Sequence, residues 1–332
     1  MGIVYSKEIK TKWFGGFAAQ LPDLKGKTIA ITGCTTGLGY VFARTCIEKN
    51  ASAVILLNRS SERAEAAEKS LKDIANSDTT VVETITCDLQ DFASVRKAVA
   101  QLKEKYDSLD VLCNNAGIMA FPDEATVDGY DVQMQTNHLS HFLLTKELYP
   151  LLQKAKQRHG SARIVSHSSW FRKNPPSRFD PMYLDRKGGQ LGGNSYWAYY
   201  QRYHHSKLAN AIFTCALQDR LEGSGIEATV AAPGYAATEL LHSSQGPALF
   251  SYAVVCNLMA QSAEDGCMPL LAAAFLPSNF NQKRPMIWEP SGFMTAAGPA
   301  VEYELTSICT QREDQIMLWE SSEAACGKFV IS

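Results

Sequence analysis

The chain has 332 residues, of which 45% are hydrophobic and 20% charged, and its formal net charge is −2. This composition is that of a globular protein with a large core, and it excludes a disordered chain or a strongly basic nucleic-acid binder. The longest apolar run, 248–260, is shorter than the roughly 18 residues that a membrane-spanning helix needs. The nine cysteines are scattered without a C-x-x-C pair. We therefore expect reduced core cysteines in a cytoplasmic protein with no nucleic-acid partner.

Residues 1–24 form an N-terminal leader before the first predicted strand. Gly2 and Ser6 fit the M-G-x-x-x-[ST] pattern for myristoylation. One acyl chain anchors a protein only weakly, so a second, electrostatic signal would be needed. The lysines that would supply it are Lys7, Lys10 and Lys12. The favoured alternative is a polar leader that is flexible or packed against the domain, and peripheral membrane contact stays open.

Short apolar runs alternate with segments of helical periodicity along the rest of the chain. The predicted strands are 27–32, 53–58, 81–88, 109–115, 163–169 and 226–234. Helices are predicted after the glycine-rich turn that follows 27–32, then over 61–75, 91–105 and 129–153, between the fifth and sixth strands, and at the end of the chain over about 311–326. This alternation predicts a doubly wound parallel sheet of the Rossmann type, in a single α/β domain over 25–332. Ligands bind such sheets beyond the carboxyl ends of the strands.

The turn after the first predicted strand reads T-G-C-T-T-G-L-G and opens a helix. Glycines there let the backbone approach a pyrophosphate, and the helix N-terminus offers free N–H groups. The alternative is a tight turn that only joins strand to helix. The expected cofactor contacts in this turn are Gly33, Thr35, Thr36, Gly37, Leu38 and Gly39.

The second predicted strand ends L-L-N-R-S, where an NAD-binding protein would carry a carboxylate for the ribose 2′-hydroxyl. Asn58 occupies that position, and no carboxylate appears before Glu62. Arg59 would attract a 2′-phosphate, and Ser60 and Arg63 would add contacts. These residues predict NADP(H), although Arg59 could also be an ordinary solvated cation.

Two more strand ends point to the same cofactor. Asp88 and Leu89 end the third predicted strand and would bracket an adenine. The N-N-A-G sequence at 114–117 ends the fourth, and its backbone and amides would line the cofactor cleft. The expected contacts there are Asn115, Ala116 and Gly117, and the alternative is a plain turn.

Tyr203 lies four residues before Lys207, on the same face of a predicted helix. Reducing a carbonyl requires a proton donor for the developing alkoxide. A tyrosine alone has a pKa near 10, and a neighbouring ammonium would lower that pKa. The tyrosines just upstream lack a lysine four residues on; they are Tyr196, Tyr199 and Tyr200. The pairing therefore indicates Tyr203 as the acid/base residue.

Together these motifs resemble the short-chain dehydrogenase/reductase family. The matches are T-G-x-x-x-G-x-G at 32–39, D-L at 88–89, N-N-A-G at 114–117, Asn137, Ser169, Y-x-x-x-K at 203–207 and P-G with a later threonine at 233–238. Locally, 126–145 and 203–213 are most similar to the retinol dehydrogenase and WW-domain oxidoreductase branch.

The resemblance implies roles for the matching residues. Ser169, rather than Ser168, would hold the substrate oxygen. Asn137 would support a water relay to Lys207, which would also bind the nicotinamide ribose. The contacts expected on the carboxamide side of the nicotinamide are Pro233, Gly234 and Thr238.

The histidines predict no metal site. His204 and His205 are adjacent in a helix and point to different faces. His138 and His141 could share a face, but no acid or cysteine joins them at ligand spacing. We expect packing or surface roles for all four.

The segment 170–202, between the expected serine and tyrosine, is rich in aromatic residues and glycine pairs. It would wall an apolar pocket, or it is a surface loop with a small core of its own. By resemblance, 235–262 would include a substrate lid. The sequence predicts an NADP(H)-dependent oxidoreductase of an apolar alcohol or carbonyl, such as a retinoid, steroid or lipid aldehyde. The alternatives are a non-catalytic NADP(H)-binding scaffold and a light-dependent tetrapyrrole reductase, and the oligomeric state is open.

Overall fold

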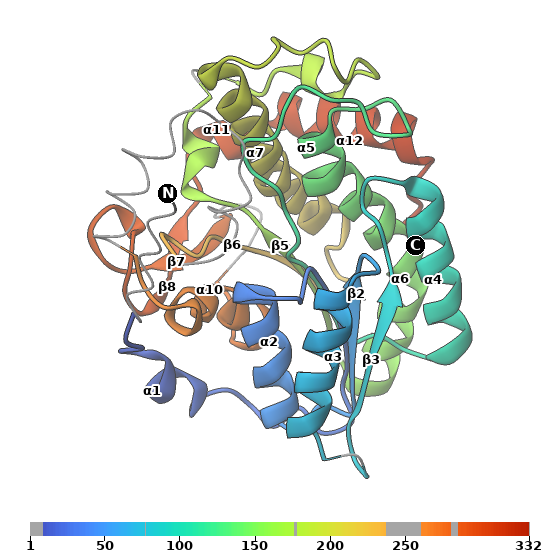
Figure 1. Cartoon of the computed structure of the whole chain (residues 1–332), viewed down its shortest axis with the longest axis vertical. Helices are drawn as coiled ribbons and strands as arrows, with labels where there is room; N and C mark the ends of the chain where they lie inside the picture. Colours follow the sequence, from blue (N-terminus) through green and yellow to red (C-terminus); the bar gives the residue numbers. More distant parts are fainter. Residues whose placement is uncertain (1–8, 77, 176–177, 237–259, 280–284, 332) are drawn as a thin grey trace.

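A parallel sheet lies at the centre of the molecule (Figure 1). The computed structural model describes residues 9–76, 78–175, 178–236, 260–279 and 285–331. Within these residues eight strands run in the order β3-β2-β1-β4-β5-β6-β7-β8. The strands are β1 Thr28–Thr32, β2 Ala53–Asn58, β3 Val81–Thr86, β4 Val111–Asn114, β5 Ala162–His167, β6 Ile226–Ala231, β7 Met286–Pro290 and β8 Ala300–Glu304. The strand order reverses between β1 and β4, which is where a sheet of this type binds its ligand.

The six strands expected from the sequence are all present, and the doubly wound fold is confirmed. Two further strands, β7 and β8, were not expected. β7 joins the parallel sheet beside β6 through Ala231 and Trp288, and β8 pairs with β7 in the antiparallel sense. Their sequences are short and separated by a Gly- and Pro-containing segment; the edge of β6 gives β7 its partner, and β7 in turn pairs with β8. The sheet is therefore parallel up to an antiparallel edge strand, a common arrangement in large α/β sheets.

Helices cover both faces of the sheet (Figure 1). One face packs against α1 Phe14–Ala18, α2 Gly37–Glu48, α3 Glu62–Ile74 and α10 Ala263–Phe275. The other packs against α4 Phe92–Lys105, α6 Ser140–His159, α7 Tyr196–Arg220 and α12 Arg312–Cys326. The shorter elements are α5 Val132–Met134, α11 Ser307–Thr310, the π-helical turn η1 Gln135–Leu139, and the 3-10 turns η2 Trp170–Lys173, η3 Pro181–Leu184 and η4 Phe293–Thr295. Because both faces are covered, the inner strands β1, β2 and β4 are apolar along almost their whole length.

The described part of the leader lies against α10. The carboxylate of Asp265 accepts backbone N–H bonds from Lys12, Trp13 and Phe14 at 2.8, 3.0 and 2.9 Å. Phe14 is buried in the same core cluster as α2 and α10. Residues 9–24 are thus packed on the domain, whereas Gly2, Ser6 and Lys7 lie outside the described residues.

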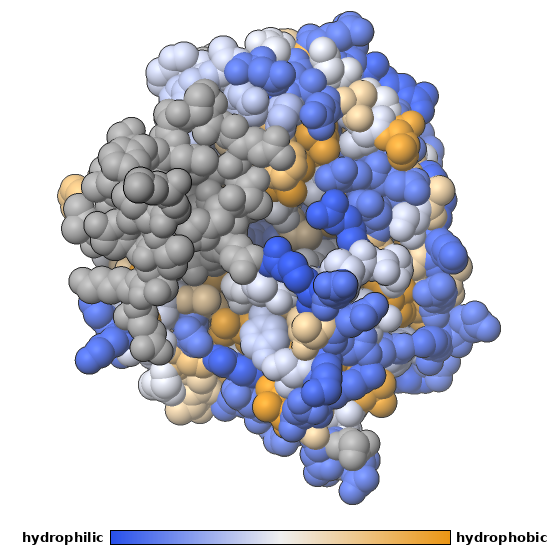
Figure 2. All heavy atoms as spheres, viewed as in Figure 1, coloured by the Kyte–Doolittle hydropathy of each residue, from blue (hydrophilic) through white to orange (hydrophobic). Residues whose placement is uncertain are grey.

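The surface has the usual character of a globular domain. Figure 2 shows one face covered mainly by hydrophilic side chains, with hydrophobic ones scattered among them. Among the residues with described positions, no helix combines the length and the apolar character needed to cross a membrane.

Candidate active site

The glycine-rich turn joins β1 to α2 at the point where the strand order reverses. Gly33 and Gly37 have φ values of +72° and +61°, which favour glycine. A Cβ at Gly39 would lie 2.0 Å from the carbonyl oxygen of Gly33 and 2.6 Å from Nδ2 of Asn115. Only glycine therefore allows α2 to begin so close to the strand ends, with its first N–H groups facing the turn.

Asn58, at the end of β2, holds this turn from the side. Its Oδ1 accepts the backbone N–H of Cys34 at 2.8 Å, and its Nδ2 is buried with no partner among the described residues. The side chain of Thr36 is exposed at the tip of the turn, where Arg63 Nη2 lies 3.5 Å from its Oγ1. The sequence predicted Asn58 as a cofactor contact, and its side-chain amide also holds the glycine-rich turn through Cys34.

The other residues expected at the adenosine end have mixed surroundings. Arg59 and Ser60 are exposed directly after β2, and Thr35 is half-buried in the turn. Asp88 is half-buried, and its Oδ1 accepts the N–H of Gln90 at 2.9 Å. Leu89 belongs to the core beside α4 and α6, and Leu38 to the core beside α10. Exposed Arg59, Ser60 and Thr36 with the glycine backbone make a polar, cation-bearing cradle that fits a dinucleotide phosphate.

Thr32, the last residue of β1, ties the N-N-A-G turn to the sheet. Its Oγ1 accepts the N–H groups of Asn115 and Ala116 at 3.0 and 2.9 Å. With both lone pairs used, its hydroxyl hydrogen is left for Nε2 of His141, 2.9 Å away. Nδ1–H of His141 then donates to the carbonyl oxygen of Asn137 at 3.0 Å. Burial lowers the pKa of His141 to about 4, which keeps this neutral tautomer.

Asn137 lies in η1, which interrupts the helical run from α5 to α6. The sequence predicted one helix over 129–153, and the observed run extends to His159 with a π-helical turn inside it. Such turns are frequent at functional sites. Oδ1 of Asn137 accepts the N–H of Ile118 at 2.8 Å, and Nδ2 donates to the Ile118 carbonyl at 2.9 Å and to Ser206 Oγ at 2.8 Å. The amide is therefore held rigidly.

Tyr203 is buried in α7, and the side chain of Ser169 is among the groups that shift the pKa of its phenol. The buried hydroxyl of Ser168 points elsewhere and donates to the carbonyl oxygen of Lys207 at 2.7 Å. Burial raises the pKa of Tyr203 to about 12, and the Ser169 side chain opposes that rise. Ser206 donates to the Tyr203 carbonyl at 2.8 Å and so links Tyr203 to the Asn137 amide.

Lys207 lies one helical turn after Tyr203, with Nζ 5.8 Å from the centre of the tyrosine ring. Nζ donates to the carbonyl oxygen of His167, at the end of β5, at 3.1 Å. Burial lowers the pKa of Lys207 to about 7. The expected lowering of the Tyr203 pKa by Lys207 is absent: burial of the phenol is the largest influence on this pKa and raises it.

Gly117 lies beside both Lys207 and Asn137, two of the catalytic residues expected from the sequence. A Cβ at this position would lie 3.1 Å from Nζ of Lys207 and 3.2 Å from Oδ1 of Asn137. The lysine and the amide therefore face the same narrow space beside the N-N-A-G backbone. The resemblance to the short-chain dehydrogenase/reductase family implied a water relay between these two side chains.

The far side of the site is built by the end of β6 and the loop after β7. Gly234 has a φ of +68°, and a Cβ there would lie 2.4 Å from the carbonyl oxygen of Ala296. The carbonyl oxygen of Pro233 accepts a hydrogen bond from Nε2 of Gln261 at 2.7 Å. Thr238 and most of the expected lid lie outside the described residues.

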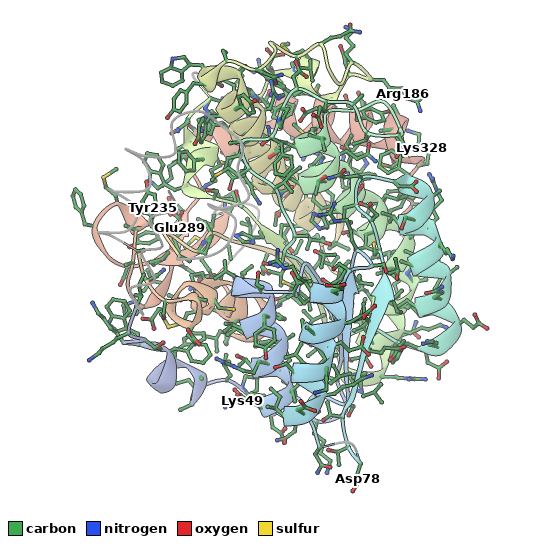
Figure 3. All side chains as sticks on the ribbon, in the orientation of Figure 1. Lys49, Asp78, Arg186, Tyr235, Glu289 and Lys328 are labelled. Carbon is green, nitrogen blue, oxygen red and sulfur yellow. The ribbon has the colours of Figure 1, made fainter. Side chains whose placement is uncertain are left out.

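A buried ion pair supports the serine turn. Arg172 donates to both carboxylate oxygens of Glu289 on β7 (labelled in Figure 3), at 2.8 and 3.0 Å, and to the carbonyl of Ser169 at 2.9 Å. Both charged side chains are almost completely buried. The sequence did not single out this pair, since an arginine in a loop carries no sign of a partner 117 residues away.

The aromatic segment 170–202 packs beside the tyrosine. Met119, Ala120, Tyr199, Tyr200 and Tyr203 form a buried cluster, and Phe171 and Tyr196 pack against it.

The expected packing roles of the two adjacent histidines agree with their contacts. The ring of His204 stacks on that of Phe171 with 5.1 Å between the ring centres, and the ring of His205 stacks on that of Tyr183 with 4.3 Å between the ring centres. Within the described ranges, no three His, Cys, Asp or Glu side chains lie close enough together to hold a metal.

The sequence and the fold match known proteins. A model of the short chain dehydrogenase family matches residues 27–183. Retinol dehydrogenase 12 of Mus musculus is 32% identical over 246 residues, which are 74% of this chain and 73% of that protein. The chain belongs to the short-chain dehydrogenase family. An uncharacterized oxidoreductase of Schizosaccharomyces pombe is 36% identical over 68% of this chain and 65% of its own length.

The solved structures of this family share the fold. An uncharacterized protein from Mycobacterium Paratuberculosis superposes with a TM-score of 0.70 at 30% identity, over 95% of this chain and 98% of its own. A carbonyl reductase from chicken fatty liver has NADPH bound, with a TM-score of 0.54 and 21% identity over 78% of this chain and 94% of its own. A 3-ketoacyl-(acyl-carrier-protein) reductase from Brucella melitensis has NADH bound, with a TM-score of 0.57 and 20% identity over 76% and 92%. Both cofactors therefore occur on this fold.

Proposed function

We propose that the protein is an NADP(H)-dependent oxidoreductase that interconverts an apolar alcohol and its aldehyde or ketone. The observation that carries the proposal is the side chain of Tyr203, which is buried one helical turn before Lys207 and whose pKa the Ser169 side chain lowers. A phenol held in this way can give a proton to a carbonyl oxygen and take one back from an alcohol. Membership of the short-chain dehydrogenase family supports the same reaction class.

The proposed catalytic roles follow from these contacts. In the reducing direction, Tyr203 would protonate the substrate oxygen while the Ser169 hydroxyl holds that oxygen in place. Lys207 would return a proton to the tyrosine through the gap that it shares with Asn137 beside Gly117. When bound, the nicotinamide supplies the hydride for reduction and accepts it in oxidation.

The proposed choice of NADP(H) rests on the residues after β2. Arg59 and Ser60 are exposed there, and the first carboxylate, Glu62, already belongs to α3. An arginine binds a 2′-phosphate through charge-assisted hydrogen bonds, whereas a carboxylate would repel it. We expect Arg59→Ala to weaken NADPH binding at least tenfold and to change NADH binding by less than twofold. Arg158→Ala, an exposed arginine in the last turn of α6, is the matched control.

The decisive experiment is a panel of apolar alcohols and carbonyl compounds, including retinoids, steroids and lipid aldehydes, assayed with NADPH and NADH in parallel. Tyr203→Phe should abolish turnover of every substrate that the wild type accepts, while NADPH still binds. Tyr303→Phe, on the edge strand β8, should leave the rate unchanged. Hydride transfer by Tyr203→Phe at the wild-type rate would refute the assignment.

The same experiment separates the other candidate functions. NADPH binding without turnover of any compound in the panel would favour a regulatory or scaffold role. A porphyrinoid whose absorbance changes on binding would favour a tetrapyrrole reductase.

We further propose that the protein works in the cytoplasm, with peripheral membrane contact through an acylated Gly2 and the lysines of the leader as the open question. Intact mass of the protein isolated from its native cell would detect a myristoyl group directly. An unmodified N-terminal mass would remove the anchor from the proposal.

A further inference from the structure

Arg202, the residue before Tyr203, has a completely buried side chain. Its guanidinium donates to backbone carbonyls rather than to solvent. Nη1 lies 3.2 Å from the carbonyl oxygen of Leu191 and 2.9 Å from that of Gly193, and Nη2 lies 3.1 Å from that of Phe121. Two distant segments of the chain are therefore joined to α7 at one side chain.

Asp123 binds the same glycine-containing loop, 188–193, by accepting hydrogen bonds from backbone N–H groups of the loop. Its carboxylate accepts the N–H of Gly189 at 3.0 Å, of Leu191 at 2.7 Å and of Gly193 at 2.8 Å. The nearest approach between the Asp123 carboxylate and Arg202 is 3.9 Å. The loop backbone is thus held by an anion that accepts from its N–H groups and a cation that donates to its carbonyls.

The third carbonyl that Arg202 binds follows a strained residue. Ala120 has a φ of +53°, a strained conformation that residues with a side chain rarely adopt. This turn packs Met119 and Ala120 against Tyr203 in the aromatic cluster. Arg202, through the carbonyl of Phe121, is the side chain that ties the strained turn to α7.

A second carboxylate, that of Asp131, connects Arg202 to α5, which begins the helical run that contains Asn137. Oδ2 of Asp131 lies 3.3 Å from Nε of Arg202, and its Oδ1 accepts the N–H groups of Gln133 and Met134 at the start of α5. Both side chains of this ion pair are fully buried. Breaking such a pair is costly, because it leaves an uncompensated buried charge.

We propose that Arg202, together with Asp123, is a positioning residue that ties loop 188–193 to the Met119–Ala120 turn, fixes that turn as a rigid apolar wall beside Tyr203, and so determines which apolar substrates fit. The inference about substrate fit rests on the proposed oxidoreductase function. A guanidinium suits this task, since its planar fork reaches carbonyls in different directions, whereas the ammonium of lysine is a point donor that cannot span them.

Arg202→Lys keeps the charge and removes the fork. Amide hydrogen exchange should become at least tenfold faster in 118–123 and 188–193, while the dissociation constant for NADPH stays within twofold. With carbonyl substrates of increasing size, KM should rise at least fivefold for the best substrate and kcat should change less. The variant should then accept bulkier substrates that the wild type rejects.

Arg163→Lys is the matched control. Arg163, near the start of β5 at the opposite end of the strands, also donates to two carbonyls, those of Ala273 and Leu276, and pairs with Glu227. It should affect stability without changing exchange in the two segments or the preference for substrate size. Equal exchange changes in both variants would overturn the proposal, as would an Arg202→Lys variant with unaltered exchange.

Asp123→Asn is the second variant, in case Arg202→Lys fails to fold. It replaces one accepting oxygen with a donor, so exchange should accelerate in 188–193 and much less in 118–121; unchanged exchange in 188–193 would overturn the proposal.

The exchange measurement does not depend on turnover. If no substrate is found but the two segments loosen as expected, the proposed function fails and the positioning role stands; if turnover is found and the size preference is unaltered, the positioning role fails alone.

Discussion

Lys207→Met should stabilise the protein free of cofactor while it abolishes catalysis. Burial lowers the pKa of Lys207 from 10.5 to about 7. At about 1.4 kcal/mol for each pH unit, this shift corresponds to about 5 kcal/mol. Because a lysine with a pKa of about 7 is half protonated at pH 7, keeping it in the folded site at that pH costs slightly less, about 4 kcal/mol. Methionine is of similar length and carries no charge. It loses the hydrogen bond to the His167 carbonyl, which contributes about 1 kcal/mol, so the expected net gain is up to about 3 kcal/mol at pH 7.

The pH dependence gives the sharper test. Between pH 7 and 10.5 the unfolded chain binds a proton at this lysine that the folded protein has lost, so the wild type gains stability as the pH rises through this window. As the pH falls from 10.5 to 7, that stability is lost again. Lys207→Met should lack this component, and the difference in unfolding free energy between the two proteins should shrink steadily from pH 7 towards pH 10.

The assay is urea denaturation of both proteins at several pH values between 6.5 and 10, with turnover and NADPH binding measured on the same samples. Lys69→Met is the matched control, because Lys69 is 82% exposed on α3 and should have little effect. A Lys207→Met variant that is less stable than the wild type at pH 7, or that shows the same pH slope, would refute the reasoning.

Three further predictions concern neighbouring residues. Gly117→Ala should lower kcat about tenfold with a fall in Tm of only a few degrees, because its Cβ would push Lys207 away from its narrow gap; an unaltered kcat in steady-state kinetics would contradict this. Glu289→Gln leaves the buried Arg172 without its charged partner and should cost about 3–5 kcal/mol in urea denaturation, and a loss below 1 kcal/mol would show that the pair is dispensable. Burial lowers the pKa of His205 to about 4, so its contribution to stability is lost as the pH falls from 6.5 to 4. His205→Gln should flatten the fall in Tm over that range, and parallel Tm curves would exclude the effect.

Local patterns were sufficient for the central part of the fold. The strand, glycine turn and helix at 27–50 are specified by neighbouring residues, since an apolar β-branched run and glycines at positive φ need no distant partner. The strands β7 and β8 were missed for the opposite reason. Their short runs become strands only where β6 offers an open edge.

The pairing of Tyr203 with Lys207 was also predictable, because four residues on a helix place two side chains on one face. The pKa values of the two groups were not predictable from that spacing. They depend on how completely the surrounding sheet, turn and aromatic segment exclude water, and burial reversed the expected direction for the tyrosine.

The sequence by itself determined the Rossmann-type sheet, the glycine turn and the spacing of the proposed catalytic residues, because these depend on periodicity and on spacing within single elements. Only the tertiary structure decided that the Ser168 hydroxyl donates to the Lys207 carbonyl, that Thr32 and His141 brace the N-N-A-G turn and Asn137, and that Arg202 and Arg172 turn inward. A charged side chain looks the same in a sequence whether water or a buried carboxylate surrounds it. Its partner is chosen by segments that meet only when the chain has folded.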